Sequence, residues 1–153
     1  MPELFFRLNG ESRRIAYEEG MNLLDVLRDQ CDLTSPKDGC SPQGACGCCT
    51  VMVEGLAVKS CLVLALQVRG KSVQTIEGLA REEILDPVQQ AFIENGAIQC
   101  GYCSAGMIMS SKALLQKNPQ PSESDVRHAL AGNLCRCTGY HKIVKAVLSV
   151  DGK

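Results

Sequence analysis

The sequence has no long run of acidic or of basic residues, and its 16 Lys and Arg nearly balance its 17 Asp and Glu. This charge pattern gives no indication of a nucleic-acid partner or of binding to a membrane surface. Apolar runs are short as well, and none approaches the roughly 18 residues that a membrane span needs. The first residues, MPELFFRLNGESRR, show no apolar segment behind a basic one. A secretory signal is therefore not predicted, and we expect a cytoplasmic protein.

Cysteine, in contrast, is abundant, with ten residues in a chain of 153. Secreted disulfide frameworks and metal ligands are the two ordinary uses of so many thiols. A chain of this length can bury a core without cross-links, and without a predicted signal peptide the metal interpretation is favoured. Most of the cysteines also cluster, because they form two groups of four that lie far apart in the sequence.

The first group lies in residues 39–61, which read GCSPQGACGCCTVMVEGLAVKSC. Cys40, Cys46, Cys49 and Cys61 are separated by five, two and eleven residues. Gaps of four and two residues are typical of the plant-type 2Fe-2S loop, so the first gap here holds one extra residue that must bulge. The glycines within the loop allow the positive φ angles with which a backbone curls around inorganic sulfide. The segment therefore predicts an iron-sulfur loop.

Short β-elements are predicted before and after this loop. Residues 3–8 and 13–17 flank Asn9-Gly10, and residues 50–53 and 56–58 flank Glu54-Gly55, so each pair predicts a hairpin. Residues 21–30 have helical apolar spacing with Asn22 as a candidate N-cap, and residues 73–76 predict a closing strand. Together these elements predict a β-grasp-like unit.

The apolar pattern changes after the polar stretch near residues 77–82, which we interpret as a linker. Apolar residues then recur every three or four positions around 84–92, 107–115, 126–130 and 143–148, which predicts a small helical bundle. Ser122 with Asp125 three residues later resembles a capping box.

The second cysteine group belongs to this helical part. Cys100 and Cys103 are three residues apart, so both could act as ligands from the start of a helix. Cys135 and Cys137 are two apart and would diverge on a helix, so we expect them in a connection. Two cysteine pairs also suit structural zinc, and this group alone leaves zinc and iron-sulfur open. The ferredoxin-like loop in the same chain favours iron-sulfur.

The motifs GCSPQGACGCCTV, SCL, QCGYCSAGM and GNLCRCTGYHKI, in this order, resemble the iron-sulfur small subunit of the molybdenum hydroxylases, the xanthine oxidase and aldehyde oxidoreductase family. The resemblance covers nearly the whole chain. It implies an α+β protein with an N-terminal β-grasp plant-ferredoxin-like domain (residues 1–78) and a C-terminal four-helix-bundle domain (residues 82–153). Each domain would hold one 2Fe-2S cluster.

Site residues follow from the same resemblance. It implies a distal cluster on Cys40, Cys46, Cys49 and Cys61, a proximal cluster on Cys100, Cys103, Cys135 and Cys137, and an approach of Gln99 to the molybdopterin. The family more often has alanine where this chain has Cys48, so Cys46, Cys48 and Cys49 offer a choice of ligand. We choose Cys49 because it preserves the two-residue and eleven-residue gaps. Cys31, His128 and His141 are not expected to be ligands.

The implied function is electron transfer by a non-catalytic subunit. Substrate would be hydroxylated at molybdopterin, expected in its cytosine dinucleotide form, on a large partner subunit. Electrons would then pass singly through two 2Fe-2S clusters to FAD on a medium partner subunit or to another acceptor. A free-standing two-cluster ferredoxin and a zinc-stabilised scaffold are the alternatives, and a net charge of -1 with an apolar helical part favours a permanent subunit over a free carrier.

Overall fold

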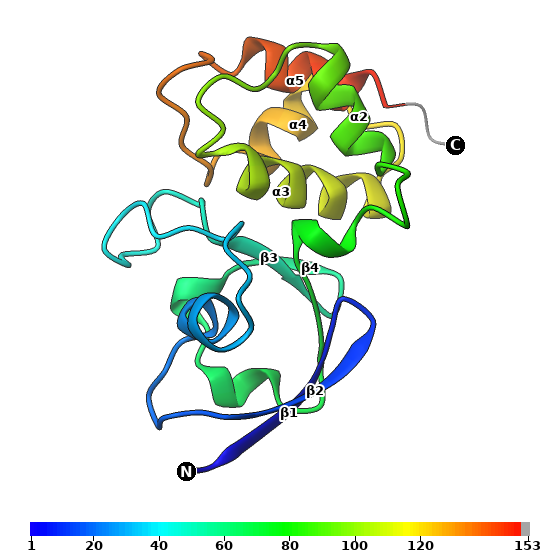
Figure 1. The fold of residues 1–153 in the computed structure, drawn as a ribbon. Helices are drawn as coiled ribbons and strands as arrows, with labels where there is room; N and C mark the ends of the chain where they lie inside the picture. Colours follow the sequence, from blue (N-terminus) through cyan, green and yellow to red (C-terminus); the bar gives the residue numbers. More distant parts are fainter. Residues whose placement is uncertain (151–153) are drawn as a thin grey trace.

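The computed structural model describes residues 1–150 and shows two stacked parts (Figure 1). The first, here called the sheet half, runs from strand β1 (Glu3–Leu8) to the 3-10 turn η4 (Ile76–Gly78). The second, the helical half, runs from helix α2 (Pro87–Glu94) to helix α5 (His141–Leu148). The predicted α+β architecture is therefore confirmed.

A mixed sheet with strand order β2-β1-β5-β3-β4 forms the framework of the sheet half. Strand β1 pairs antiparallel with β2 (Glu11–Ala16) and parallel with β5 (Ser72–Gln74). Strand β3 (Thr50–Val53) pairs antiparallel with both β4 (Leu56–Lys59) and β5. Strand β5, the predicted closing strand, thus lies in the middle of the sheet and joins the two hairpins.

Both hairpin turns form where the sequence predicts them. Asn9 and Gly10 have φ angles of 51° and 87°, and Glu54 and Gly55 have φ angles of 51° and 78°. Positive φ at both central residues is the signature of the type I′ turn, whose twist matches that of the flanking strands.

The helix predicted at residues 21–30 forms as helix α1 (Leu23–Asp25) followed by a π-helical turn, η1 (Val26–Gln30). Asn22 caps it, since its side chain accepts a 2.9 Å hydrogen bond from the Asp25 amide. Two 3-10 turns, η2 (Ser60–Leu62) and η3 (Ala65–Val68), connect β4 to β5.

The helical half also contains α3 (Ser104–Lys117) and α4 (Glu123–Ala129). Ser122 caps α4 together with Asp125, as predicted. Helix α2 begins later than the apolar pattern suggests. Pro87 occupies its first turn, and Asp86 is the N-cap because its carboxylate accepts a hydrogen bond from the Val88 amide. Ile84 lies before the helix and is 75% exposed.

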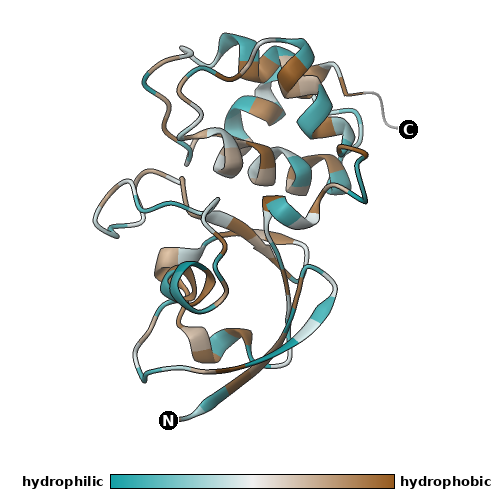
Figure 2. Cartoon of the chain, in the orientation of Figure 1, coloured by the Kyte–Doolittle hydropathy of each residue, from teal (hydrophilic) through white to brown (hydrophobic). Residues whose placement is uncertain are grey.

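Each half has its own buried apolar core, and Figure 2 shows hydrophobic and hydrophilic segments alternating along β1 and the helices. The largest fully buried side chains of the sheet half are Leu4, Leu23, Leu27, Val26, Val51 and Val68. Those of the helical half are Phe92, Met107, Met109, Leu130 and Ile143, joined by Met52 from β3. Met52 thus anchors the sheet beneath α3, which packs along β3 (Figure 1).

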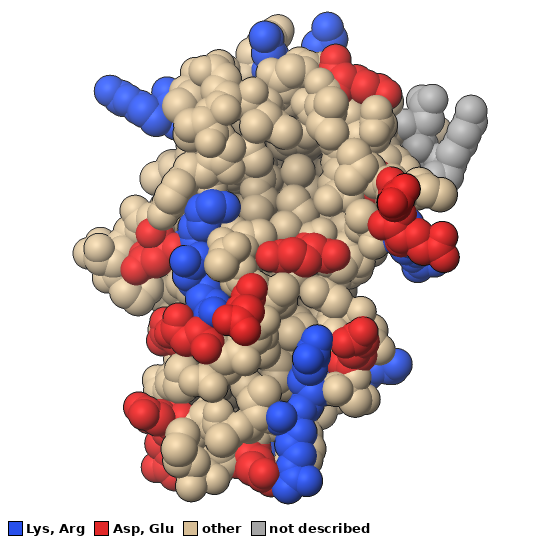
Figure 3. Space-filling view, in the orientation of Figure 1, with Lys and Arg blue, Asp and Glu red and all other residues tan. Residues whose placement is uncertain are grey.

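Charged side chains of both signs are interspersed over the sheet half on the face shown in Figure 3. Within residues 1–150, the structure contains no helix whose length and apolarity would suffice to cross a membrane.

Candidate metal centres

The first cysteine loop connects η1 to β3 and turns its backbone amides toward a sulfur atom. The Asp38 carboxylate starts the turn by accepting hydrogen bonds from the amides of Cys40 (3.1 Å) and Ser41 (2.7 Å). The Gln43 amide then donates to Cys40 Sγ over 3.2 Å. Amides that point at a sulfur in this way are what an iron-sulfur loop requires.

Electrostatics at Cys40 reflect this curl. Backbone hydrogen bonds from Cys46, Ala45 and Gln43 lower the pKa of the Cys40 thiol to about 7. Such donors stabilise the negative charge of a thiolate, which is the form that binds metal.

The four thiols of the predicted distal group, here the distal tetrad (Cys40, Cys46, Cys49 and Cys61), come together as two pairs. The Cys46 thiol interacts directly with that of Cys40. Cys61, carried by η2, is buried, and this burial together with the adjacent Cys49 thiol raises its pKa to about 12. The charge of Cys40 also acts on Cys61, so the two pairs share one site.

Cys48 occupies a different position from Cys49. Burial, followed by the charge of Cys46 and a side-chain hydrogen bond with the Cys46 thiol, raises the pKa of Cys48 to about 12. The Cys48 sulfur lies against Gly39, as do the Cys46 sulfur and the Tyr102 ring of the helical half. Cys49, in contrast, is the residue that contacts Cys61.

The predicted proximal group, here the proximal tetrad (Cys100, Cys103, Cys135 and Cys137), also forms two pairs. Cys103 interacts with Cys135, and Cys100 with Cys137. Cys103 is the N-cap of α3 and Cys100 precedes the helix, so Cys100 and Cys103 lie in the turn before the helix and not on its first face. Cys135 and Cys137 lie in the connection between α4 and α5, as predicted.

Local contacts distinguish the thiols of this second group. Burial and the neighbouring Cys135 thiol raise the pKa of Cys103 to about 12. At Cys135 burial acts in the same direction, but hydrogen bonds from the Thr138 hydroxyl (3.0 Å) and amide (3.5 Å) outweigh it and lower the pKa. The pKa of Cys137 is raised by the thiol of Cys100.

Tyr140 holds the α4–α5 connection in shape and was not singled out by the sequence patterns. Its hydroxyl accepts a hydrogen bond from the Cys135 amide (3.0 Å) and donates one to the Asn133 carbonyl (2.9 Å). Its backbone is left-handed, with φ 69°, directly after Gly139. An unusual conformation in a residue other than glycine is a signal that only the structure provides.

The two tetrads lie next to each other across the interface between the halves. The Leu134 amide, one residue before Cys135, donates a 2.8 Å hydrogen bond to the Cys46 carbonyl. At the rim of this interface, the Tyr102 hydroxyl donates a 2.7 Å hydrogen bond to the Asp38 carbonyl. Leu134 and Tyr102, each next to or close to a ligand of the proximal tetrad, thus contact the loop that carries the distal tetrad.

Exposure differs between the tetrads. In the distal tetrad Cys46, Cys49 and Cys61 are buried and Cys40 is half-buried, whereas Cys100 and Cys137 of the proximal tetrad are exposed. The predicted site residue Gln99 is exposed beside Cys100. The proximal site therefore opens to the surface on the side of Cys100 and Cys137.

Four cysteines can hold either a 2Fe-2S cluster or a structural zinc ion, and the two need different arrangements of thiols. A 2Fe-2S cluster takes four cysteine ligands, two on each iron, and two thiol pairs around one space suit it. Structural zinc needs all four ligands around a single point. Two thiol pairs in each tetrad, with a backbone amide directed at Cys40 Sγ, fit 2Fe-2S clusters.

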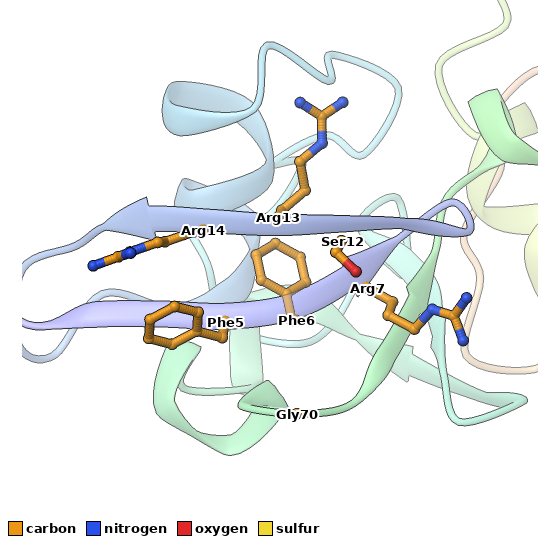
Figure 4. Close-up of a pocket in the computed structure, with 7 residues that line it drawn as sticks. All are labelled: Phe5, Phe6, Arg7, Ser12, Arg13, Arg14 and Gly70. Carbon is orange, nitrogen blue, oxygen red and sulfur yellow. The ribbon is translucent and has the colours of Figure 1, made fainter.

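The remaining candidates lie away from these sites. His128 and His141 are exposed on α4 and α5, and Cys31 is a half-buried thiol whose pKa is raised by burial. A surface pocket of about 340 Å³ lies over the β1–β2 hairpin (Figure 4), and its lining contains no cysteine. There the Arg14 guanidinium lies 5.1 Å from the centre of the Phe5 ring and pairs with Glu3.

Two family models match the chain. The model of the 2Fe-2S iron-sulfur cluster binding domain matches residues 6–80, and the model of the 2Fe-2S binding domain matches residues 75–148. The chain therefore contains two 2Fe-2S binding domains, one in each half.

Similar proteins point to one class of enzyme. The nicotinate dehydrogenase small FeS subunit of Eubacterium barkeri is 51% identical over 140 residues, which cover 92% of this chain and 88% of that protein. Quinoline 2-oxidoreductase from Pseudomonas putida 86 contains a chain with a TM-score of 0.93 at 42% identity, covering 97% of this chain and 91% of that one.

Aldehyde oxidoreductase from Desulfovibrio desulfuricans is also similar in structure, with a TM-score of 0.94 and 43% identity. The match covers 98% of this chain but 17% of that one, so there the same fold is part of a much larger polypeptide. The chain belongs to the family of 2Fe-2S small subunits of the molybdenum hydroxylases, the family of xanthine dehydrogenase, nicotinate dehydrogenase and aldehyde oxidoreductase.

Proposed function

We propose that this chain is an electron-transfer subunit that passes electrons singly from molybdopterin on a large partner subunit to FAD on a medium partner subunit, or to another acceptor, by way of two 2Fe-2S clusters. When bound, the clusters supply reversible one-electron chemistry. The residues of this chain hold the clusters, set their surroundings and align them, and none of them acts on the substrate.

One observation carries this proposal: the two cysteine tetrads meet at one interface. The Leu134 amide, next to Cys135, donates a hydrogen bond to the Cys46 carbonyl, and the Tyr102 hydroxyl, between Cys100 and Cys103, donates one to the Asp38 carbonyl beside the distal loop. Two separate structural metal sites would have no need to adjoin. Adjacent redox sites are what a relay of single electrons requires.

The distal tetrad is suited to hold a cluster in its reduced, more negative state. Amides of the 39–49 loop surround Cys40, and the Lys59 ammonium, which donates a 2.6 Å hydrogen bond to the Gly44 carbonyl, lies against the same loop. Hydrogen bonds to sulfur and nearby positive charge are the protein's means of raising a cluster potential.

The exposed side of the proximal tetrad is the surface on which we place the large partner subunit. Cys100 and Cys137 are exposed there, and their neighbours Ile98 and Leu134 are 42% and 53% exposed. Gln99 lies in the same segment, and we assign it the approach to molybdopterin, in the cytosine dinucleotide form. The much larger aldehyde oxidoreductase chain that contains this fold is consistent with a permanent neighbour.

We place the boundary between the two cluster domains in residues 78–82, between η4 and α2, so that the domains comprise residues 1–78 and 82–153. The separate apolar cores of the two halves support this division.

Substitution of one proximal ligand tests the proposed relay. Cys103→Ser in the assembled enzyme should abolish the proximal cluster signal in electron paramagnetic resonance spectra and stop electron delivery, while the distal signal remains. Cys31→Ser is the control, because Cys31 is a thiol that belongs to neither tetrad. Retention of both signals and of full turnover in Cys103→Ser would refute the ligand assignment and the relay with it.

A further inference from the structure

Asn133 is a buried polar residue at the interface between the two halves. It lies in the α4–α5 connection, and only 4% of its surface is exposed. Its Oδ1 accepts a 2.8 Å hydrogen bond from the Ser110 hydroxyl of α3. Its Nδ2 donates to the Gly47 carbonyl (3.1 Å) and to the Thr50 hydroxyl (3.4 Å). One side chain thus connects α3, the first cysteine loop and the start of β3.

The backbone around Asn133 is packed too closely to accept extra atoms. A Cβ added to Gly47 would overlap the Gly132 carbonyl and lie 2.8 Å from Asn133 Nδ2. A Cβ added to Gly106 would overlap the Gly47 carbonyl. The Gly47 peptide is therefore clamped between α3 on one side and residues 132–133 on the other.

The position of these contacts along the chain relates them to the cysteines. Gly47 follows Cys46 directly, and Asn133 precedes Cys135 by two residues. The Asn133 side chain and the neighbouring hydrogen bond from Leu134 to Cys46 therefore link a ligand segment of the distal tetrad to one of the proximal tetrad. Buried from water, such hydrogen bonds are costly to leave unmade.

The chemistry of an amide is needed at this position. Asn133 acts as acceptor toward Ser110 and as donor toward Gly47 at the same time. An aspartate could still accept from Ser110 but would direct a carboxylate oxygen at the Gly47 carbonyl, and a leucine could do neither. Both would remove the hydrogen bond from the helical half to the Gly47 carbonyl, which would keep only the bonds from the Thr50 hydroxyl (2.7 Å) and amide (3.1 Å) of its own half.

We propose that Asn133 is a positioning residue that fixes the distance and orientation between the two 2Fe-2S clusters. This inference rests on the proposed function, since it requires that both tetrads hold clusters. It assigns to Asn133 the alignment of the relay and not the holding of either cluster.

The test compares Asn133→Asp and Asn133→Leu with Asn95→Asp in the full-length chain loaded with iron and sulfide. Asn95 is the matched control, because its Nδ2 donates to Ala91 O (2.9 Å) and Ser149 Oγ (3.1 Å) inside the helical half, away from the interface. Iron and acid-labile sulfide are measured first. Electron paramagnetic resonance of the fully reduced chain then reports the splitting that arises from interaction between the two reduced clusters.

The expected result is that the two Asn133 variants keep the two cluster signals but lose the interaction splitting. Asn95→Asp is expected to keep the two signals and the splitting. The leucine variant separates loss of the hydrogen bonds from the added charge of aspartate. Unchanged splitting in both Asn133 variants with full cluster content would overturn the inference. A wild-type chain without two cluster signals would instead overturn the proposed function, so the two failures are distinguishable.

Ser110→Ala keeps the inference testable if the Asn133 variants do not fold. It retains Asn133 and removes only the hydroxyl that orients its amide. A smaller loss of splitting in the same direction is expected, and an unchanged splitting in this variant would contradict the positioning role.

Discussion

Replacing Gly47 by alanine is expected to destabilise the chain at the interface between its halves. Gly47 has φ +73°, and its added Cβ would overlap the Gly132 carbonyl. The left-handed conformation costs alanine about 1–2 kcal/mol. Forcing a methyl group into a packed site costs about 1–3 kcal/mol more. The smaller conformational freedom of alanine in the unfolded chain offsets about 0.4–1 kcal/mol of this loss.

Gly55→Ala is the matched control, because Gly55 has φ +78° and its Cβ would meet nothing within 4 Å. Backbone strain and unfolded-state freedom are the same in both variants, so their difference isolates the contact, about 1–3 kcal/mol. At about 2–4 °C per kcal/mol for a chain of this size, Gly47→Ala should melt about 2–12 °C below Gly55→Ala. The assay is thermal unfolding of the cluster-loaded chain under anaerobic conditions, followed by circular dichroism. Equal melting temperatures would refute the close packing at Gly47.

Two further predictions concern single side chains. Cys48→Ala should leave both clusters in place, as measured by iron and sulfide content, because Cys49 and not Cys48 contacts Cys61; loss of the distal signal would show that Cys48 is the ligand. Burial alone would raise the pKa of Glu77, but hydrogen bonds from Ser35 and Thr75 outweigh it and lower the pKa below its ordinary value of 4.5. Glu77 therefore stabilises the fold above that pH and loses this contribution as the pH falls through its folded-state pKa. Urea unfolding should show wild type more stable than Glu77→Gln at neutral pH, with the gap closing in acid; a gap independent of pH would contradict this.

Features that depend on local chemistry could be predicted from the sequence. Asn9-Gly10 requires only a turn with two positive φ angles, and Ser122 requires only an amide three residues on, so each is determined by its neighbours. The grouping of cysteines along the chain is also visible in the sequence, because it depends only on their spacing. The assignment of four thiols to each cluster stays a prediction.

Features that depend on distant contacts could not be predicted. Asn133 contacts Gly47 across 86 positions of sequence, and nothing in the pattern around either residue indicates the other. The position of Cys103 as N-cap, with Cys100 outside the helix, depends on how α3 packs at the interface, whereas the i, i+3 spacing suggested a shared helix face. Ile84 fits the apolar period of α2, but the helix begins only at Pro87, with Asp86 as its N-cap, so Ile84 lies outside it.

The most direct test of the account is the iron and acid-labile sulfide content of the anaerobically purified chain, with electron paramagnetic resonance during stepwise reduction. The account predicts four irons and four sulfides per chain, about two of each for every four-cysteine site, and two distinct signals from reduced clusters. Zinc without labile sulfide would contradict it and would leave two structural metal sites in place of an electron relay.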